Sequence, residues 1–322
     1  RRGDDTRATI AVISDRADWC REKVHAWFDE ATGLRRICDE KPAPSAGDEL
    51  ILYQTLLGTW PLDLDTKNQA EIDHYRDRLV AWQRKAIREA KLESFWSAPN
   101  DAYENACEYF LNELLTSPNA QYLRDDIEQA AREIAPAGAI NALAQTLLRL
   151  TSPGIPDLYQ GTEFWDFSLV EPDNRQAVDY AARISVLQHK HNYFSDELLD
   201  NWQDGRIKQW LIQRTLTLRK QYADLFAYGD YQPLEVEGER ANKVVAFLRE
   251  YKGLCLIVII PRLTFELLNG NTRPQIVPSE WQNTAVLLPD FVRPYIIKQN
   301  LVSAIDGRIS DGVIYLRDAL SR

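Results

Sequence analysis

Apolar side chains recur at intervals of three and four residues through the first 150 positions, and this period predicts helices. From Ala17 to Ala31, Trp19 and Trp27 follow the spacing, and Asp15 or Asp18 is expected to cap the helix. The same period predicts further helices over residues 50–58, 66–92, 101–115 and 121–150.

Proline and glycine mark the expected ends of these helices. The stretch 41–47 and the stretch 97–100 both contain proline, so each is expected to separate two helices. Pro136 and Gly138 lie inside the last helical segment. Because a proline removes a backbone N–H, we expect an interruption of the helix there.

The pattern changes at Thr151. Residues 153–161 form a short apolar run between prolines and glycines, which excludes a helix interior and predicts a buried strand over 155–159 followed by a turn. An irregular loop rich in aromatic and acidic residues follows over 163–174. The middle of the chain is therefore predicted as one strand leading into one long loop.

Helices and then strands are expected in the remainder of the chain. Residues 177–189 and 198–222 read as helical. Beyond Gly229, short apolar runs between turn residues predict the strands of an antiparallel sandwich. These runs cover residues 244–248, 254–260, 285–288 and 313–316, and the run at 254–260 is expected to be a core strand.

Composition narrows the functional classes. The chain has 322 residues, of which 45% are hydrophobic and 27% charged, with a net charge of −10. This acidic balance argues against a nucleic-acid partner, and no apolar stretch approaches the roughly 18 residues that span a membrane. The four cysteines lie far apart with no CxxC pair, which predicts free thiols in a reducing cytoplasm.

Motifs for nucleotides, metals and nucleophilic serine do not occur: the sequence has no GxxxxGK[ST], GxGxxG, HExxH, GxSxG or EF-hand pattern. His189 and His191 are two residues apart and would not face one another on a helix, so a solvated helix end is expected there. The sequence therefore predicts no metal and no cofactor.

The segment from Thr151 to Tyr180 carries the chemistry that the rest of the chain lacks. Its aromatic residues stand among carboxylates, amides and an arginine, a combination that suits sugars. Ring faces accept sugar C–H groups, and polar side chains pair with hydroxyls. The alternative is a structural loop in which the aromatics are buried and Arg175 pairs with Asp173 or Asp179.

The run at 153–163, PGIPDLYQGTE, resembles the eighth barrel strand of the α-amylase superfamily, in which Pro-Gly-x-Pro-x-x-Tyr-x-Gly-x-Glu recurs. The extension over 163–180, EFWDFSLVEPDNRQAVDY, resembles the maltooligosyl trehalose synthase family more narrowly. Residues 1–8, RRGDDTRA, resemble the family's Lys-Arg-Gly-Glu-Asp-x-Arg-Ala run, with arginine in place of lysine. Residues 53–61, 85–91, 96–99 and 103–104 also match in order and spacing, and the resemblance weakens after about residue 265.

The resemblance implies an isomerase that converts the reducing-end α-1,4 linkage of a maltooligosaccharide to the α,α-1,1 linkage of trehalose. Such retaining chemistry needs two carboxyl groups about 5–5.5 Å apart. In the family, the run that matches residues 1–8 follows a His-Asp-Thr at the end of barrel strand seven. The resemblance thus implies that the catalytic carboxylates precede residue 1, and the missing initiator Met agrees with a fragment. We expect no catalytic residue in this chain and an upstream barrel portion as its partner.

Within the resemblance, the loop 160–175 is expected to form one wall of the sugar site, because loops after barrel strands build such sites. The acids and arginines near the N-terminus are expected to pair with each other at a helix start, and the alternative is that they contact substrate. They are Arg2, Asp4, Asp5 and Arg7. The residues expected to line or support the sugar site are Gln160, Glu163, Trp165, Asp166, Asp173, Asn174 and Arg175.

The predicted fold class is mixed α and β. It comprises a barrel helix (1–35), a helical insertion (36–150), the last strand-helix unit of a (β/α)8 barrel with its substrate loop (151–225), and a C-terminal antiparallel β-sandwich (226–322). The predicted ligand is a maltooligosaccharide. The alternatives are a non-catalytic glycan-binding or structural module, and another glycoside hydrolase of the amylase superfamily.

Overall fold

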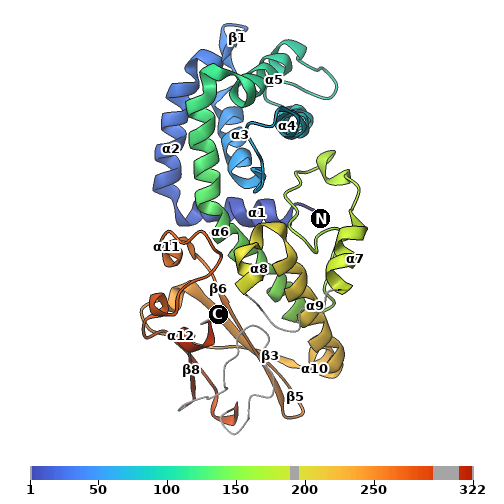
Figure 1. Ribbon diagram of the computed structural model, residues 1–322, viewed down its shortest axis with the longest axis vertical. Helices are drawn as coiled ribbons and strands as arrows, with labels where there is room; N and C mark the ends of the chain where they lie inside the picture. The colour runs from blue at the N-terminus through green and yellow to red at the C-terminus, as the bar shows by residue number, and fades with distance from the viewer. Residues whose placement is uncertain (1, 189–195, 293–311, 321–322) are drawn as a thin grey trace. The chain divides into compact units, whose positions relative to one another are not determined.

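The computed structural model of the chain describes residues 2–188, 196–292 and 312–320 (Figure 1). The chain folds into two compact units. Unit 1 comprises Arg1–Ala135 and Asp166–Ala177, and unit 2 comprises Pro136–Trp165 and Val178–Arg322. The predicted sugar loop is therefore divided between Trp165 and Asp166, and each half belongs to its own unit.

Unit 1 is built mainly of helices. They are α1 (Asp4–Ile10), α2 (Ala17–Glu30), α3 (Ala46–Thr59), α4 (Gln69–Ala90), α5 (Asp101–Thr116) and the first half of α6 (Gln121–Thr151). The strands β1 (Arg36–Cys38) and β2 (Lys41–Ala43) form an antiparallel hairpin between α2 and α3. The side chains of Ser45, Asn68 and Asn100 cap α3, α4 and α5 by accepting a backbone N–H. The helices predicted from the apolar period are thus confirmed.

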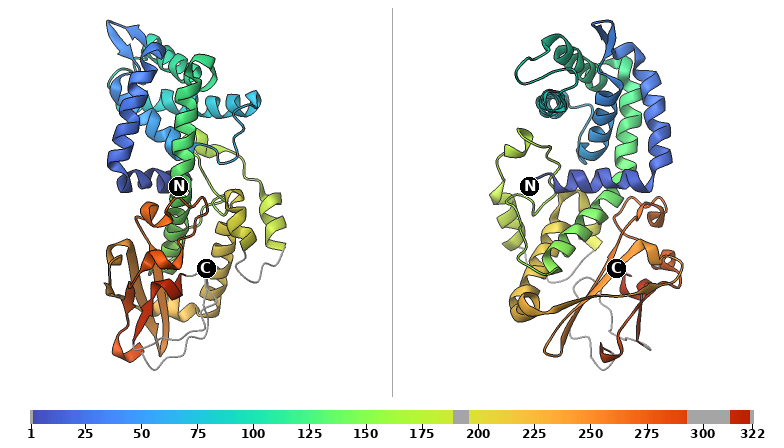
Figure 2. Two further views of the ribbon diagram at one scale, coloured as in Figure 1. Left: turned by 60° about the vertical axis from the view of Figure 1, so that its left-hand side comes forward. Right: turned by 180° about the vertical axis from the view of Figure 1, so that it is seen from behind.

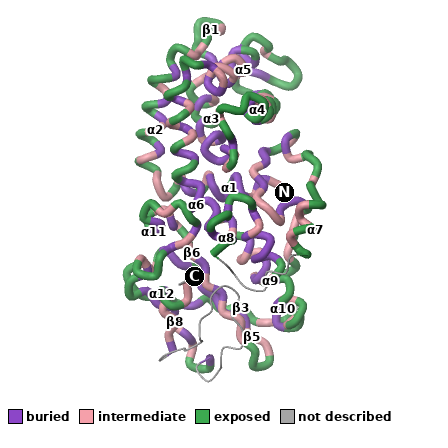
Figure 3. The backbone as a smooth tube through the Cα atoms, viewed as in Figure 1, coloured by how far each residue is buried: buried purple, intermediate pink, exposed green. Residues whose placement is uncertain are grey.

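A buried ion pair and packed aromatic rings join α2 to α3. Trp27 is fully buried and packs edge-on against Tyr53, with ring centroids 5.3 Å apart. The Tyr53 hydroxyl donates to Glu49 at 2.7 Å, and Glu49 also accepts two hydrogen bonds from Arg35. Buried positions follow α3 through the middle of this unit (Figure 3). The start of unit 1 is therefore held by apolar packing around one charged pair.

The predicted cap of α2 was wrong. The residue before the helix is Arg16, which makes no side-chain capping bond, while Asp15 ends a 3-10 turn over 11–15. Because this turn runs almost directly into the helix, neither Asp15 nor Asp18 stands at the capping position.

The predicted interruption at Pro136 was also wrong. Helix α6 continues through Pro136 without a break from Gln121 to Thr151. An interior proline costs about 3 kcal/mol. Because the neighbouring Ile134 and Ala137 are almost completely buried, tertiary packing offsets that cost.

Unit 2 continues α6 and adds shorter helices. These are α7 (Tyr180–Gln188), α8 (Asp196–Asp200), α9 (Arg206–Gln221), α10 (Ala223–Tyr228), α11 (Phe265–Leu268) and α12 (Leu316–Ala319). The segment predicted as one helix over 198–222 is divided at Gly205, which adopts a positive φ before α9. His189 and His191 lie outside the described residues.

Two small antiparallel sheets complete unit 2 (Figure 2). One has the order β3-β5-β6, and the other β4-β7-β8. The first contains β3 (Asp230–Pro233), β5 (Val244–Tyr251) and β6 (Leu254–Pro261), and the second β4 (Val236–Glu237), β7 (Ala285–Leu287) and β8 (Val313–Tyr315). All four apolar runs predicted as strands are confirmed as β5, β6, β7 and β8.

One face of the β5-β6 ribbon supplies a core of unit 2. Phe247, Val258 and Ile260 are buried and pack against Leu147 and Leu148 of α6. Val258 and Ile260 make β6 a core strand, as predicted, whereas Leu254 at its start is 37% exposed. This alternation is the normal pattern of an antiparallel strand with one solvated face.

The strand expected over 155–159 does not form. These residues have no regular secondary structure, and Ile155 is 97% exposed. A parallel barrel strand needs neighbours on both sides for its backbone hydrogen bonds. Within the described residues, no strand pairs with this segment, which is why its apolar sequence alone does not make it a strand.

No helix in the described part of the chain is long and apolar enough to cross a bilayer.

Arg249 of β5 joins several chain segments of unit 2. Its side chain is almost completely buried and donates to the carbonyl oxygens of Thr151, Leu225, Phe226 and Gly229. The end of α6 and the end of α10 are thereby tied to the sheet, where a cation also suits the negative ends of helix dipoles. Burial, followed by repulsion from Arg219, lowers the pKa of Arg249.

Replacing Arg249 with methionine should destabilise unit 2. The buried carbonyl oxygens would lose their donors, at a cost of roughly 3 kcal/mol in the free energy of unfolding. Urea denaturation followed by circular dichroism measures this change. Arg21→Met is the control, because Arg21 is exposed and pairs with exposed Asp18. A loss for Arg249→Met no larger than for the control would contradict the role given to Arg249.

Candidate functional site

The seven residues predicted for the sugar site lie on an irregular loop. Between residues 160 and 175 the only regular element described is a 3-10 turn over Asp173–Arg175. Gln160, Glu163 and Trp165 belong to unit 2, and the other four predicted residues belong to unit 1. In unit 1, Arg2 links Asp166 to the Asn174 carbonyl, whereas Gln160, Glu163 and Trp165 of unit 2 each contact different partners. The two groups are described separately.

In unit 1, Asp166 connects the loop to the N-terminal residues. It is 4% exposed and accepts from Arg2 Nε at 2.8 Å and from the Ser168 backbone N–H at 2.9 Å. Its own backbone N–H donates to Asp5 Oδ2 at 2.6 Å. These hydrogen bonds use the oxygens of Asp166 within the protein. Asp166 therefore has a structural role in holding the loop.

Gly3 allows the N-terminal residues to approach the loop this closely. It has a φ of 79°, in the left-handed region, and a Cβ at this position would lie 2.1 Å from the carbonyl oxygen of Ser168. The same carbonyl accepts from the Thr6 hydroxyl at 3.1 Å. Only glycine fits both the conformation and the space.

Asp173 holds the second half of the loop. It is 6% exposed, and Arg78 of α4 grips both of its oxygens, at 2.8 and 3.0 Å. The Leu169 backbone N–H and the Gln176 side-chain amide donate to it at 2.7 and 2.8 Å. A bidentate arginine pair gives both strength and fixed geometry, so Asp173 also has a supporting position.

Both buried carboxyl groups are held in the ionised form. Burial by itself would raise the pKa of Asp166 and of Asp173. The hydrogen bonds from Ser168 and Arg2 to Asp166, and from Arg78 to Asp173, outweigh burial, and both pKa values lie below the ordinary aspartate value.

Asn174 and Arg175 lie at the edge of this cluster. The Asn174 carbonyl accepts from Arg2, and its side chain is half-buried. Arg175 is exposed and pairs with Glu171. The alternative of a structural loop placed Arg175 with Asp173 or Asp179, but Arg175 pairs with Glu171 and it is Arg78 that pairs with Asp173.

In unit 2, Glu163 is paired with a helix residue. Glu163 Oε2 accepts from the Gly161 N–H at 3.0 Å and from Arg183 of α7 at 3.1 Å. Arg183 also donates to the Gly161 carbonyl, and its guanidinium lies over the Phe164 ring. Exposed Gln160 accepts from the Tyr180 hydroxyl at 2.6 Å. These contacts fix the start of the loop to the first turns of α7.

Trp165 is half-buried and held on several sides. Its indole N–H donates to the Trp202 carbonyl at 2.6 Å, and the two rings meet edge-on. Lys208 Nζ lies over the Trp165 ring, 5.7 Å from its centroid. A Cβ on Gly205 would lie 2.8 Å from the Trp165 backbone nitrogen, so glycine is required there. Lys208 was not among the residues predicted for the site, and the sequence marks it only by its position in the first turn of α9, after Gly205.

The N-terminal charges only partly pair with each other as predicted. Asp4 and Arg7 form an ion pair, whereas Arg2 and Asp5 bind the loop at Asp166. Among the described residues, no three His, Cys, Asp or Glu side chains come together as a metal site.

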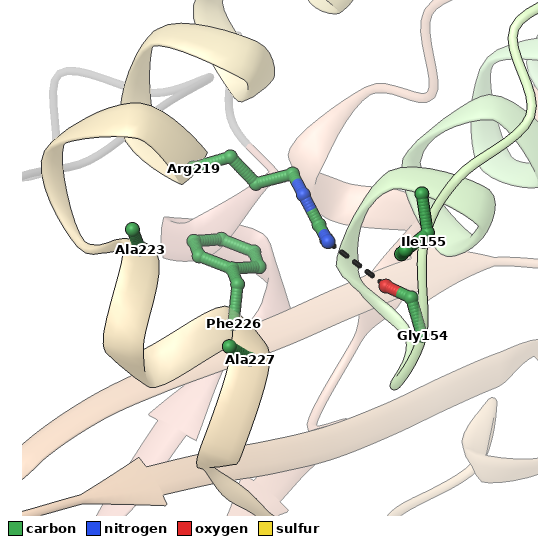
Figure 4. A pocket seen from close by; sticks show the side chains of 6 residues that line it. All are labelled: Gly154, Ile155, Arg219, Ala223, Phe226 and Ala227. Carbon is green, nitrogen blue, oxygen red and sulfur yellow. Dashed lines mark hydrogen bonds between the residues drawn. The ribbon is translucent and has the colours of Figure 1, made fainter.

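A small cavity lies beside the segment that was predicted as a strand (Figure 4). Its volume is about 310 Å³, and its lining includes Gly154, Ile155, Arg219 and Phe226. The Arg219 guanidinium donates to the Gly154 and Leu150 carbonyls and lies over the Phe226 ring. None of the seven predicted site residues lines this cavity.

No family model matches the chain. Two curated proteins of Mycobacterium tuberculosis, from strains CDC 1551 and H37Rv, are each 32% identical to it over 293 residues, covering 90% of this chain and 32% of the relative. Both carry the name of maltooligosyl trehalose synthase. The chain thus spans about a third of the length of these relatives.

Solved structures of the same enzyme are also similar to the chain. A crystal structure of a maltooligosyl trehalose synthase is 31% identical with a TM-score of 0.68, covering 80% of this chain and 32% of that chain. The Arthrobacter ramosus maltooligosyltrehalose synthase is 30% identical with a TM-score of 0.66, covering 89% and 32%. The curated relatives and these solved structures are synthases by name, and all carry the name of maltooligosyl trehalose synthase. The resemblance to that family, inferred above from the motifs, is confirmed.

Replacing Asp173 with asparagine should remove a pH-dependent part of the stability. Because the pKa of Asp173 is lowered in the folded protein, its carboxylate stabilises the fold above the unfolded-state value of about 3.9. That contribution is lost as the pH falls through the lower folded-state value. Urea denaturation should therefore show a large difference between wild type and variant at pH 7 that shrinks below about pH 4. A difference that stays constant with pH would contradict the role of the charge.

Proposed function

We propose that the chain forms part of the substrate site of an enzyme that makes trehalose linkages. The reaction is the conversion of the reducing-end α-1,4 linkage of a maltooligosaccharide to an α,α-1,1 linkage by retaining intramolecular transglucosylation. The names of the related synthases support this reaction. Since the match covers about a third of each relative, we assign catalysis to the remainder of such an enzyme.

The observation that carries the proposal is the way in which the loop 160–175 is anchored. Transfer within one substrate requires that the released glucose stay bound, turn over and attack through its anomeric hydroxyl before water does. A site for that step needs rigid walls that keep water out. Buried Asp166 and Asp173 anchor the part of the loop in unit 1, and the pair of Glu163 with Arg183 anchors the part in unit 2. The more exposed predicted residues offer hydrogen-bonding groups, and they are Gln160, Glu163, Asn174 and Arg175.

Trp165 is the aromatic surface of this proposed wall. Its indole N–H and one ring face are already engaged by Trp202 and Lys208, which fixes the orientation of the ring. The half-exposed remainder of the ring is the part assigned to sugar contact. Under the proposal, all seven predicted residues belong to the sugar site, with the two buried aspartates as supports.

The finer architecture is part of the same proposal. Residues 1–35 and 151–225 would belong to the end of a (β/α)8 barrel, 36–150 to a helical insertion, and 226–322 to a β-sandwich. The strand at 155–159 would form only when neighbouring barrel strands complete its hydrogen bonds. The free thiols of all four cysteines support a reducing compartment, and we propose the cytoplasm.

Calorimetric titration with maltopentaose tests the proposal on this chain. We expect saturable binding that Trp165→Ala weakens by about two- to tenfold and Trp165→Phe by less, because a smaller ring keeps part of the stacking surface. Tyr228→Ala is the control, since Tyr228 is an exposed aromatic residue of α10 in the same unit. The absence of binding by the wild-type chain would contradict the proposed function.

In the whole enzyme, the same Trp165→Ala change should alter the products. A less complete wall admits water, so the ratio of trehalose-capped product to free glucose should fall. Product analysis by chromatography measures this ratio. An unchanged ratio together with an unchanged KM would remove Trp165 from the site.

A further inference from the structure

Basic residues on one side of α4 lie between the anchored loop and an exposed aromatic residue. Arg78 binds Asp173, and seven residues further on Lys85 Nζ lies 4.0 Å from Glu171, next to the same part of the loop. Arg88 is the next basic residue on this side, three positions after Lys85. Arg78 and Arg88 are ten residues apart, about 15 Å along the helix.

Trp96 lies beside Arg88, the last of these basic residues. The Arg88 guanidinium is over its ring, 5.2 Å from the centroid. Trp96 is nevertheless 56% exposed, and the neighbouring Phe95 and Leu92 are 40% and 76% exposed. Large apolar side chains clustered at the surface usually mark a binding site.

The loop that carries Trp96 is held as firmly as the sugar loop. Buried Ser94 donates to Glu104 and accepts from the Asn100 backbone N–H at 2.9 Å. Glu104 is 4% exposed and accepts both Nε and Nη2 of Arg88 at 2.7 Å. The Arg88 hydrogen bond is also the main reason that the pKa of Glu104 is lowered. Trp96 is therefore an exposed ring next to a firmly held loop segment.

We propose that Trp96 and Arg88 form an outer subsite for a maltooligosaccharide whose other end lies at the loop 166–175. The inference rests on the proposed function and extends it to the length of the substrate. A flat indole beside a guanidinium fits a glucose unit, because the ring stacks on C–H groups while the cation pairs with hydroxyls. The loop 166–175 and Trp96 both belong to unit 1, and both are contacted by residues of α4.

The length of the substrate is the property that tests this subsite. Titrating the chain with maltotriose and with maltoheptaose compares a sugar of few glucose units with one that has enough units to contact both the loop 166–175 and Trp96. We expect Trp96→Ala to weaken maltoheptaose binding by about two- to tenfold and to leave maltotriose binding unchanged. Trp96→Tyr should recover part of the lost affinity, because an aromatic face remains.

Trp19 provides a matched control. It is also a partly exposed tryptophan of unit 1 with an arginine over its ring, since the Arg16 guanidinium lies 5.0 Å from its centroid. Trp19→Ala should leave the affinities for both sugars unchanged. An equal effect of Trp19→Ala and Trp96→Ala on maltoheptaose would overturn the subsite.

The remaining outcomes distinguish the two proposals. If the wild-type chain binds both sugars and Trp96→Ala changes neither affinity, or both equally, the outer subsite is wrong and the proposed function stands. A role of the surface around Trp96 in binding another protein would give this same result. If the wild-type chain binds neither sugar, the proposed function fails and the outer subsite fails with it.

Discussion

Buried carboxylates gripped by arginine hold the irregular parts of this protein in place. Fixing the backbone of each loop residue costs about 1–2 kcal/mol of conformational entropy, and the loop after Asp166 has almost no regular hydrogen bonding of its own. Asp173 replaces that bonding by joining Arg78, the Leu169 N–H and the Gln176 amide. Removing one partner of such a buried pair costs about 3–5 kcal/mol, so the order of the loop depends on these contacts.

Among the described residues of unit 1, three buried carboxylates are held by an arginine through two hydrogen bonds. Arg35 grips Glu49, Arg78 grips Asp173, and Arg88 grips Glu104, each through Nε and Nη2. Arg35–Glu49 and Arg78–Asp173 each tie a connection between helices to a helix. Arg88–Glu104 joins α4 to α5, and Glu104 also accepts from Ser94 in the loop between these helices. The buried ion pairs thus hold the loops, and other, more exposed side chains are available to contact a ligand. A pre-organised binding surface requires this division.

Local features of the fold could be predicted from the sequence, and long-range pairing could not. The apolar period gave α4 and α5, and the alternating runs gave β5 and β6. The strand at 155–159 and the break at Pro136 were wrong, because each depends on neighbours that composition does not reveal. For the site, the aromatic and acidic residues identified the loop. Its partners Arg2 and Arg78, at sequence separations of 164 and 95 residues, carry no local signal.

The most direct measurement is a titration of the chain with maltopentaose followed by the indole N–H signals of its nine tryptophans in ¹H–¹⁵N NMR spectra. All nine rings report in one experiment, and those far from the sugar serve as internal controls. The account predicts a saturable shift of the Trp165 signal, while the Trp19 signal stays in place. An unmoved Trp165 signal at saturating sugar would contradict the claim that the loop 160–175 is a wall of the sugar site.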